Sequence, residues 1–184
     1  MTDPLRDHQQ DLCLLRDFLS SNSNIRVGEI GLDKTRKDTF EVQKEIFKYQ
    51  LQLACDLGRS VSIHCVRAHG TLFDIFREFE VNSASLPSGI YLHSWSGSVD
   101  ITRNILRLKR ISNLVYFGFS QKINLDRQDL LCIIPKDKIL TESDLLYDDP
   151  LRTHSLEQVL LTLDLKTAQV YENFLKFISI MKKE

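Results

Sequence analysis

The stretch Arg26-Val-Gly-Glu-Ile-Gly-Leu-Asp33 decides how this 184-residue chain folds. Its apolar run, residues 25–30, is typical of a buried strand, but Glu29 interrupts it. A buried carboxylate is costly unless a basic residue or a metal ion compensates its charge. Glu29 is therefore a candidate metal ligand, and the alternative is an acid paired with Arg or Lys.

Three further polar residues repeat this pattern along the chain. His64 ends the apolar run 61–64, His93 ends 89–93, and Asp144 ends 138–144. The intervals from Glu29 onward are 35, 29 and 51 residues, which fit one, one and two strand-plus-helix units of ~30 residues. One side chain capable of binding metal thus lies at the C-terminal end of each of four strands. The alternatives are satisfied core histidines and an aspartate that caps the next segment.

The composition indicates one domain, residues 1–184, with a sizeable core, because 42% of the residues are hydrophobic. A complete eight-stranded α/β barrel typically needs ~250 residues, so the chain is short for one. A net charge of −1 provides no overall basic field for nucleic acid. We expect neither a signal peptide nor a membrane span. The scattered cysteines are interpreted as reduced thiols: Cys13, Cys55, Cys65 and Cys132.

Helical periodicity alternates with the strands. We expect helices over residues 5–20, from Asp38 or Thr39 to Leu57, over 72–79, from Ser98, near 125–133, and from Ser155 and Asp164. Residues 113–119 form a fifth strand. Strands that alternate with helices indicate a parallel sheet with right-handed crossovers, and hence an α/β fold. Metal-type residues on strands this far apart favour a barrel over an open sheet, because closure brings the strand ends around one mouth.

The motifs resemble the TatD family of metal-dependent deoxyribonucleases. They are Gly28-Glu-Ile-Gly-Leu-Asp33, Gln43, Ile63-His64, His93-Ser-Trp-Ser-Gly97, Glu142-Ser-Asp144 and Asn173-Phe-Leu-Lys-Phe177. The variants Ile63-His-Cys-Val-Arg67 and His93-Ser-Trp-Ser-Gly97 look most like the fungal branch. The resemblance implies a TIM-type barrel, one or two divalent metal ions (Mg, Mn or Zn), exonuclease-like hydrolysis of phosphodiester bonds in DNA, and a cytoplasmic and/or nuclear location.

The same resemblance implies roles for individual residues. Glu29 resembles the metal-bridging carboxylate, His64 and His93 resemble metal ligands, and Asp144 resembles the ligand that also orients the attacking water. Arg67 is a candidate for binding phosphate, or else a surface charge. Trp95 could stack on a base, or else pack the barrel rim.

Three departures from the family pattern matter. The family's first strand carries a His-x-His pair that this chain lacks, and Glu29 corresponds to the fourth strand. We therefore expect about five of eight barrel strands, corresponding to the C-terminal part of a (β/α)8 barrel. The usual Thr-Asp-Ala-Pro ending is here Ser143-Asp-Leu-Leu146, and Arg67 lies one residue further from the histidine than usual.

These departures lead to two expectations. The Glu29 and Asp144 strands should form open edges, with marginal stability, aggregation or a protein partner covering them. These residues alone should bind metal weakly and turn over little DNA. The alternative function is that of a truncated or catalytically degenerate relative that acts as a protein-binding or scaffold protein.

Overall fold

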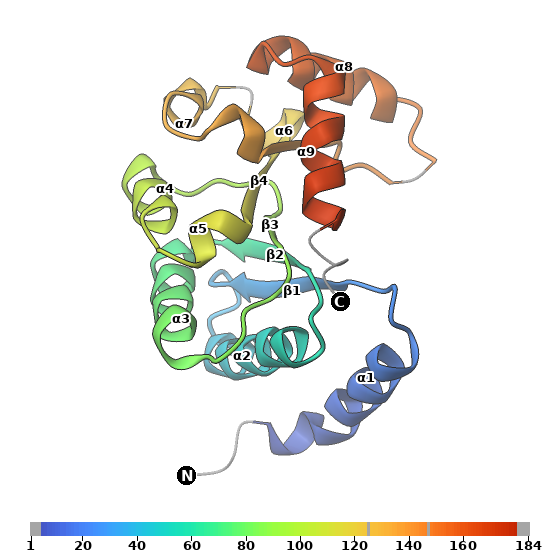
Figure 1. The fold of residues 1–184 in the computed structure, drawn as a ribbon, viewed down its shortest axis with the longest axis vertical. Coiled ribbons are helices and arrows are strands. Elements are labelled where there is room, and N and C mark those ends of the chain that lie inside the picture. Colours follow the sequence, from blue (N-terminus) through green and yellow to red (C-terminus); the bar gives the residue numbers. More distant parts are fainter. Residues whose placement is uncertain (1–4, 125, 147, 180–184) are drawn as a thin grey trace.

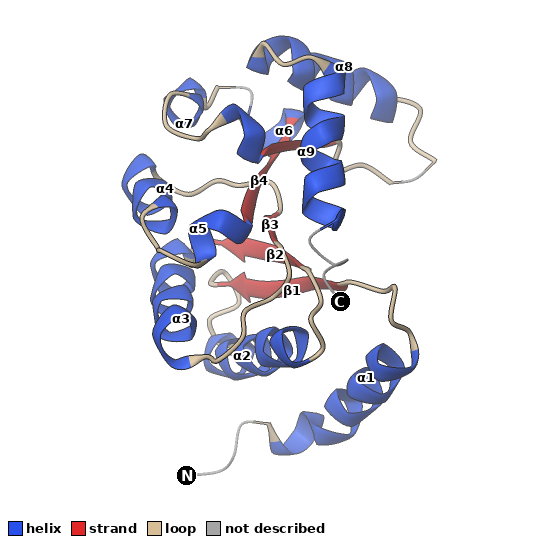
Figure 2. Ribbon diagram, in the orientation of Figure 1, coloured by secondary structure: helices blue, strands red, loops and turns tan. Residues whose placement is uncertain are grey.

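The computed structural model describes residues 5–124, 126–146 and 148–179. Five parallel strands form one sheet in the order β1-β2-β3-β4-β5. The strands are β1 (Val27–Asp33), β2 (Val61–Val66), β3 (Ile90–Leu92), β4 (Val115–Ser120) and β5 (Ile139–Glu142). The predicted α/β fold is confirmed. Within the described residues the sheet stays open, with β1 and β5 at its edges as expected (Figure 2).

Helices connect the strands, as Figure 1 shows from blue to red along the chain. They are η1 (Arg6–His8), α1 (Gln9–Ser21), α2 (Phe40–Asp56), α3 (His69–Asn82), α4 (Val99–Leu106), α5 (Ile111–Leu114), α6 (Gln121–Asn124), α7 (Gln128–Leu131), η2 (Lys136–Lys138), α8 (Arg152–Leu163) and α9 (Thr167–Ser179). The predicted cap of α4 is confirmed, since the Ser98 hydroxyl accepts a hydrogen bond from the Ile101 amide at 3.3 Å.

Two predicted helix starts are wrong. The last two helices begin at Arg152 and Thr167, not at Ser155 and Asp164. Asp164 instead follows the end of α8 in a left-handed conformation, with φ 48°. Aspartate tolerates this conformation, so the residue that resembled a start signal acts as the stop signal.

The sheet separates two apolar regions. A row of side chains, Ile63, Leu92, Phe117 and Ile139, crosses four strands in register, and each is at most 2% exposed. This row belongs to the main core, together with apolar residues of α2 and α3 such as Phe47 and Phe76. The strands therefore have one mainly apolar face, as strands covered by helices require.

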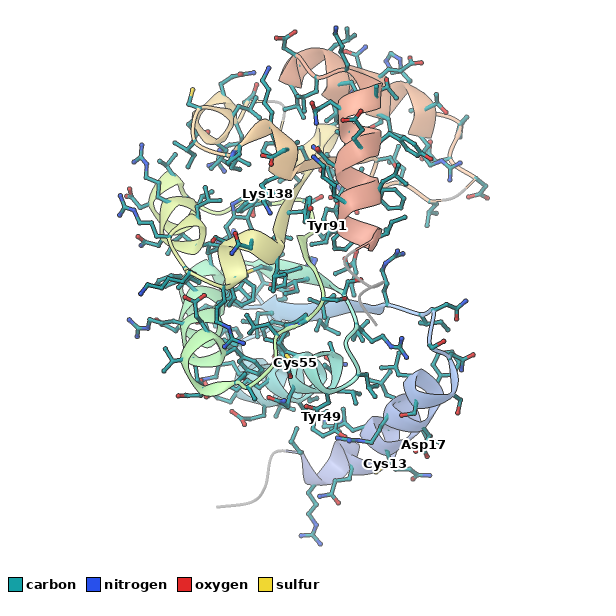
Figure 3. The ribbon with its side chains drawn as sticks, in the orientation of Figure 1. Cys13, Asp17, Tyr49, Cys55, Tyr91 and Lys138 are labelled. Atoms are coloured by element: carbon teal, nitrogen blue, oxygen red, sulfur yellow. The ribbon has the colours of Figure 1, made fainter. Side chains whose placement is uncertain are left out.

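The opposite face has a smaller apolar cluster and is crossed by α9. Tyr116 and Leu140 pack with Phe177, near the end of α9, and Tyr91 joins them. Figure 3 shows Tyr91 between the sheet and α9. The Phe177 ring also lies 5.8 Å from the Arg26 guanidinium, just before β1. The last helix thus reaches from one edge strand toward the other at the N-terminal ends of the strands, and leaves their C-terminal ends free.

Candidate metal centre

Four polar side chains from four strands approach one another, but Glu29 is the third residue of the seven-residue β1, whereas the sequence pattern predicted it at the C-terminal end of its strand. Glu29 lies on β1 and His64 on β2, whereas His93 follows the last residue of β3 and Asp144 lies two residues beyond β5. One ligand atom each from Glu29, His64 and His93 lies within 4.8 Å of the other two. The expected convergence of these side chains is present in the structure.

Residues of the first motif hold β1 against β2 and α2. Gly31 pairs with His64 and has φ 152°, and a Cβ atom there would collide with the His64 carbonyl. Only glycine fits this close approach. At the end of β1, the Gln43 side chain accepts a hydrogen bond from the Asp33 amide at 2.8 Å and donates to its carbonyl at 3.2 Å. These contacts explain why the motif combines Gly31, Asp33 and Gln43.

Asp144 reaches the group through His93. Its Oδ1 lies 3.4 Å from His93 Nε2, while Glu29 Oε1 lies 3.4 Å from His93 Nδ1. The Asp144 backbone is left-handed, with φ 54°, which turns the chain back toward the sheet after β5. The two carboxylates therefore flank opposite nitrogens of one imidazole, and both stay open to solvent, with side chains 49% and 39% exposed.

Glu142, the last residue of β5, is a member of the group to which the sequence interpretation assigned no role. Its Oε2 lies 2.8 Å from His93 Nδ1, and its side chain is only 14% exposed. It was recognisable as a carboxylate at the end of a strand, two residues before Asp144. Because side chains alternate along a strand, Leu140 and Glu142 share the face that carries Tyr91 and His93. Tyr91 and Ser94, which contact Glu142, were missed as well.

The electrostatics of the group call for a positive charge. The hydrogen bond from His93 to Glu142 is the largest influence on the histidine, and with the charges of Glu29 and Asp144 it raises the pKa of His93 from 6.5 to about 9. The acidic surroundings therefore favour the protonated form of His93 in the metal-free chain. Burial raises the pKa of Glu142, but the hydrogen bonds from His93, Ser94 and Tyr91 outweigh it and the pKa is lowered. A divalent cation would supply the same positive charge.

The residues fit a divalent metal ion. Imidazole nitrogens and carboxylate oxygens suit Zn, Mn or Mg, which bind such ligands at about 2.0–2.2 Å. Two such bonds span at most about 4.4 Å, so ligand atoms within 4.8 Å of one another need only small side-chain shifts. The half-exposed Glu29 also leaves the position open from solvent.

The two residues predicted to bind substrate differ in their exposure to solvent. Arg67 is exposed directly beyond β2, with φ 53°, and its phosphate role stays a prediction. Trp95 is 1% exposed; its indole nitrogen donates to Thr102 Oγ1 at 2.8 Å and its ring contacts Phe117. The buried ring leaves no face for a base, so the structure favours the packing alternative.

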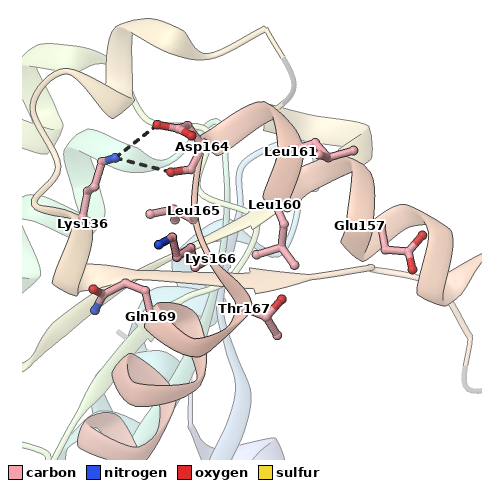
Figure 4. A pocket seen from close by; sticks show the side chains of 9 residues that line it. All are labelled: Lys136, Glu157, Leu160, Leu161, Asp164, Leu165, Lys166, Thr167 and Gln169. Carbon is pink, nitrogen blue, oxygen red and sulfur yellow. Dashed lines mark hydrogen bonds and ion pairs between the residues drawn. The ribbon is translucent and has the colours of Figure 1, made fainter.

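A hollow among the described residues lies away from this group. It has a volume of about 900 Å³ and lies against the turn between α8 and α9, beside Lys136, which precedes β5 (Figure 4). A second, apolar groove of about 650 Å³ runs between β5, α8 and α9 and borders Glu142. The metal-type group itself is open to solvent through the exposed carboxylates of Glu29 and Asp144.

Comparisons with known proteins agree with this arrangement. The model of the family "TatD related DNase" matches residues 4–172, which is most of the chain. The chain belongs to this family. A 3'-5' ssDNA/RNA exonuclease TatD of Edwardsiella piscicida is 31% identical over 134 residues, covering 72% of this chain and 50% of the relative. An uncharacterized metal-dependent hydrolase, YabD, of Bacillus subtilis is 26% identical over 144 residues, covering 74% and 52%.

Two solved structures have a similar fold. The crystal structure of the TatD homologue YJJV from Escherichia coli superposes with a TM-score of 0.73 at 23% identity, covering 90% of this chain and 69% of that one. An uncharacterized amidohydrolase from Saccharomyces cerevisiae gives a TM-score of 0.72 at 19% identity, covering 92% and 70%. The chain spans about half the length of the relatives that it matches in sequence. The fungal branch stays a prediction.

Proposed function

We propose that this chain is a metal-dependent hydrolase that cleaves phosphodiester bonds, a deoxyribonuclease of exonuclease type. The observation that carries the proposal is the convergence of Glu29, His64 and His93 from three neighbouring strands. Membership of the TatD-related DNase family and the exonuclease activity named for relatives support the same reaction class. A bound divalent ion, one or two of Mg, Mn or Zn, would make hydroxide available near neutral pH and neutralise phosphate charge.

Each side chain of the group would have a distinct role in the reaction. Glu29, His64 and His93 hold the metal, with Glu29 on the solvent side. Asp144, which is 39% exposed and 3.4 Å from His93 Nε2, orients the attacking water and accepts its proton. Arg67 supplies a phosphate contact from the loop after β2. Residues 1–184 act as one domain, equivalent to the C-terminal part of a (β/α)8 barrel.

The test is nucleotide release from single-stranded DNA with Mn²⁺ or Mg²⁺, comparing this chain with Glu29→Ala and with Glu172→Ala, an exposed glutamate on α9. We expect slow release, because the His-x-His pair is missing, with loss in Glu29→Ala and no change in Glu172→Ala. Equal release by the Glu29→Ala variant and by the unchanged chain would contradict the proposal.

A second candidate function is that of a protein-binding relative without catalysis. It is supported by the two open edges, β1 and β5, and by the apolar groove beside β5, to which Tyr171 and Phe174 contribute partly exposed rings. In this case a protein partner would cover the edges. Absence of DNA cleavage with any of the three metals, together with stable capture of an edge-covering protein, would favour this function over the first.

Within the described residues, no helix combines the length and apolar composition needed to cross a bilayer. The predicted cytoplasmic and/or nuclear location is part of the proposal. A fluorescent fusion in intact cells would test it.

A further inference from the structure

Glu142 is the most heavily hydrogen-bonded carboxylate at the sheet ends. Its Oε2 accepts from the Tyr91 hydroxyl and faces His93 Nδ1 at 2.8 Å. Its Oε1 accepts from the Ser94 amide at 2.6 Å and from the Ser94 hydroxyl. A carboxylate offers about four acceptor sites. The four donors fill them, so Glu142 has no site left for a metal ion.

The hydrogen bond to Glu142 involves only one of the two ring nitrogens of His93, Nδ1. Nδ1 is 2.8 Å from Glu142 Oε2 but 3.4 Å from Glu29 Oε1, so Glu142 is the hydrogen-bond acceptor. An imidazole that donates from Nδ1 has its lone pair on Nε2 when neutral. Nε2 points toward Asp144, whose Oδ1 lies 3.4 Å away. The nitrogen free to bind metal is therefore the one beside Asp144.

Glu142 also holds the backbone that follows His93. Ser94 has φ 39°, a left-handed conformation that residues with side chains seldom adopt without support. Both its amide and its hydroxyl donate to Glu142, and its hydroxyl also bonds Ser120 Oγ at 2.9 Å. Ser120 and Glu142 are register partners on β4 and β5. The residue after β3 is thus tied to β4 through the Ser120 hydroxyl and to β5 through the Glu142 carboxylate.

Tyr91 completes the arrangement from the buried side. It lies two residues before His93 on the same face of the sheet, and its hydroxyl donates to Glu142. Its ring occupies the space above Gly118, where a Cβ atom would collide with the phenol. The carboxylate is therefore held in place by a partly buried phenol as well as by the backbone that it supports.

We propose that Glu142 is a positioning residue that directs His93 Nε2, and not Nδ1, toward the metal. This inference rests on the proposed function, because it assumes that His93 is a ligand. When a ligating histidine donates its other ring N–H to a carboxylate, the hydrogen bond fixes the orientation of the ring and makes the ligating nitrogen a better electron-pair donor to the metal. Glu142 itself stays outside the coordination shell.

The experiment measures Zn²⁺ binding calorimetrically and the imidazole 15N shifts of the Zn²⁺-loaded full chain by NMR. In the unchanged chain we expect His93 Nε2 to show a metal-bound shift and Nδ1 a protonated shift. Glu142→Ala should weaken Zn²⁺ binding ~10–100-fold, the usual loss for an outer-shell partner. Glu142→Gln, which can still accept from Nδ1, should recover part of this loss. Glu172→Gln on the exposed side of α9 should change nothing.

The outcomes separate this inference from the proposed function. Zn²⁺ binding by the unchanged chain that is insensitive to Glu29→Ala and His64→Ala would contradict the metal centre itself. Binding that depends on both residues but is equal in Glu142→Ala would overturn only the positioning role. If Glu142→Ala fails to fold, the NMR spectrum of the unchanged chain still decides, because Zn²⁺ on His93 Nδ1 would refute the inference.

Discussion

The two faces of the sheet differ in what completes them. The face toward α2 and α3 is closed by the chain's own side chains, and the row Ile63, Leu92, Phe117 and Ile139 is fully packed. The opposite face carries four polar or aromatic side chains: His64, Tyr91, His93 and Glu142. Through Phe177, α9 packs on this face near the N-terminal ends of the strands. The first face therefore contributes most of the buried apolar surface. The second face carries the charged side chains.

The largest expected effect is on the closed face. Phe117 is 0% exposed and lies in the middle of the apolar row. Phe117→Ala should lower the free energy of unfolding by ~3–5 kcal/mol, because it leaves a cavity in a packed core. Urea unfolding measures this, with Phe18→Ala on the exposed side of α1 as the matched control. Equal losses in both variants would show that the row is not the centre of the core.

The next prediction concerns pH and the open face. The pKa of His93 is raised from 6.5 to about 9, first of all by its hydrogen bond to Glu142. A raised pKa means that the folded state holds a proton that the unfolded state has lost. This stabilisation is complete below about pH 6.5 and is lost as pH rises through about 9. Urea unfolding of the metal-free chain should show this decline, and Glu142→Gln should flatten it.

The protonation of Glu142 also makes folding stability depend on pH, but in the opposite direction. Its pKa lies below the usual 4.5, so its contribution is present above that value and is lost as pH falls further. The open face should therefore be most stable, without metal, between about pH 4.5 and 6.5. A stability that rises steadily from pH 6.5 to 9 would contradict the His93–Glu142 interaction.

The smallest expected effect on stability is at the apolar groove beside β5. Phe174 lines this groove and is 42% exposed. Phe174→Asp should change the free energy of unfolding by less than ~0.5 kcal/mol, as surface substitutions do. It should nevertheless reduce self-association in sedimentation velocity, since exposed apolar surface beside an open edge favours contacts between chains. Val81→Asp, exposed at the end of α3, is the control and should change neither property.

The closed face was the more predictable one from sequence. The run predicted at 113–119 contains most of β4, Val115–Ser120, which is buried throughout. Such a run indicates burial because burial on both sides of a strand excludes most polar side chains. The five strands, their order and the open edges followed from runs of this kind. The helix starts at 152 and 167 were misplaced, since Ser and Asp favour both caps and turns, and the backbone of Asp164 uses the second option.

The open face was predictable only in part. His64, His93 and Asp144 stood out because each ends an apolar run, and Glu29 because it interrupts one. Glu142 did not, because its importance depends on contacts with Tyr91 and Ser94, which are 51 and 48 residues away in the chain. Trp95 next to His93 suggested a base-stacking ring, but its burial depends on Thr102 and Phe117, whose positions only the folded chain reveals.

The central claim is that Glu29, His64 and His93 together bind a divalent metal ion. Its most direct test is Zn²⁺ titration of the purified chain by calorimetry, with Glu29→Ala and His64→Ala as variants and the exposed His154→Ala on α8 as the matched control. We predict saturable binding by the unchanged chain and by His154→Ala, weakened at least ~100-fold in the other two, because losing a direct ligand costs more than losing an outer-shell partner. The same affinity in all four proteins would contradict the claim.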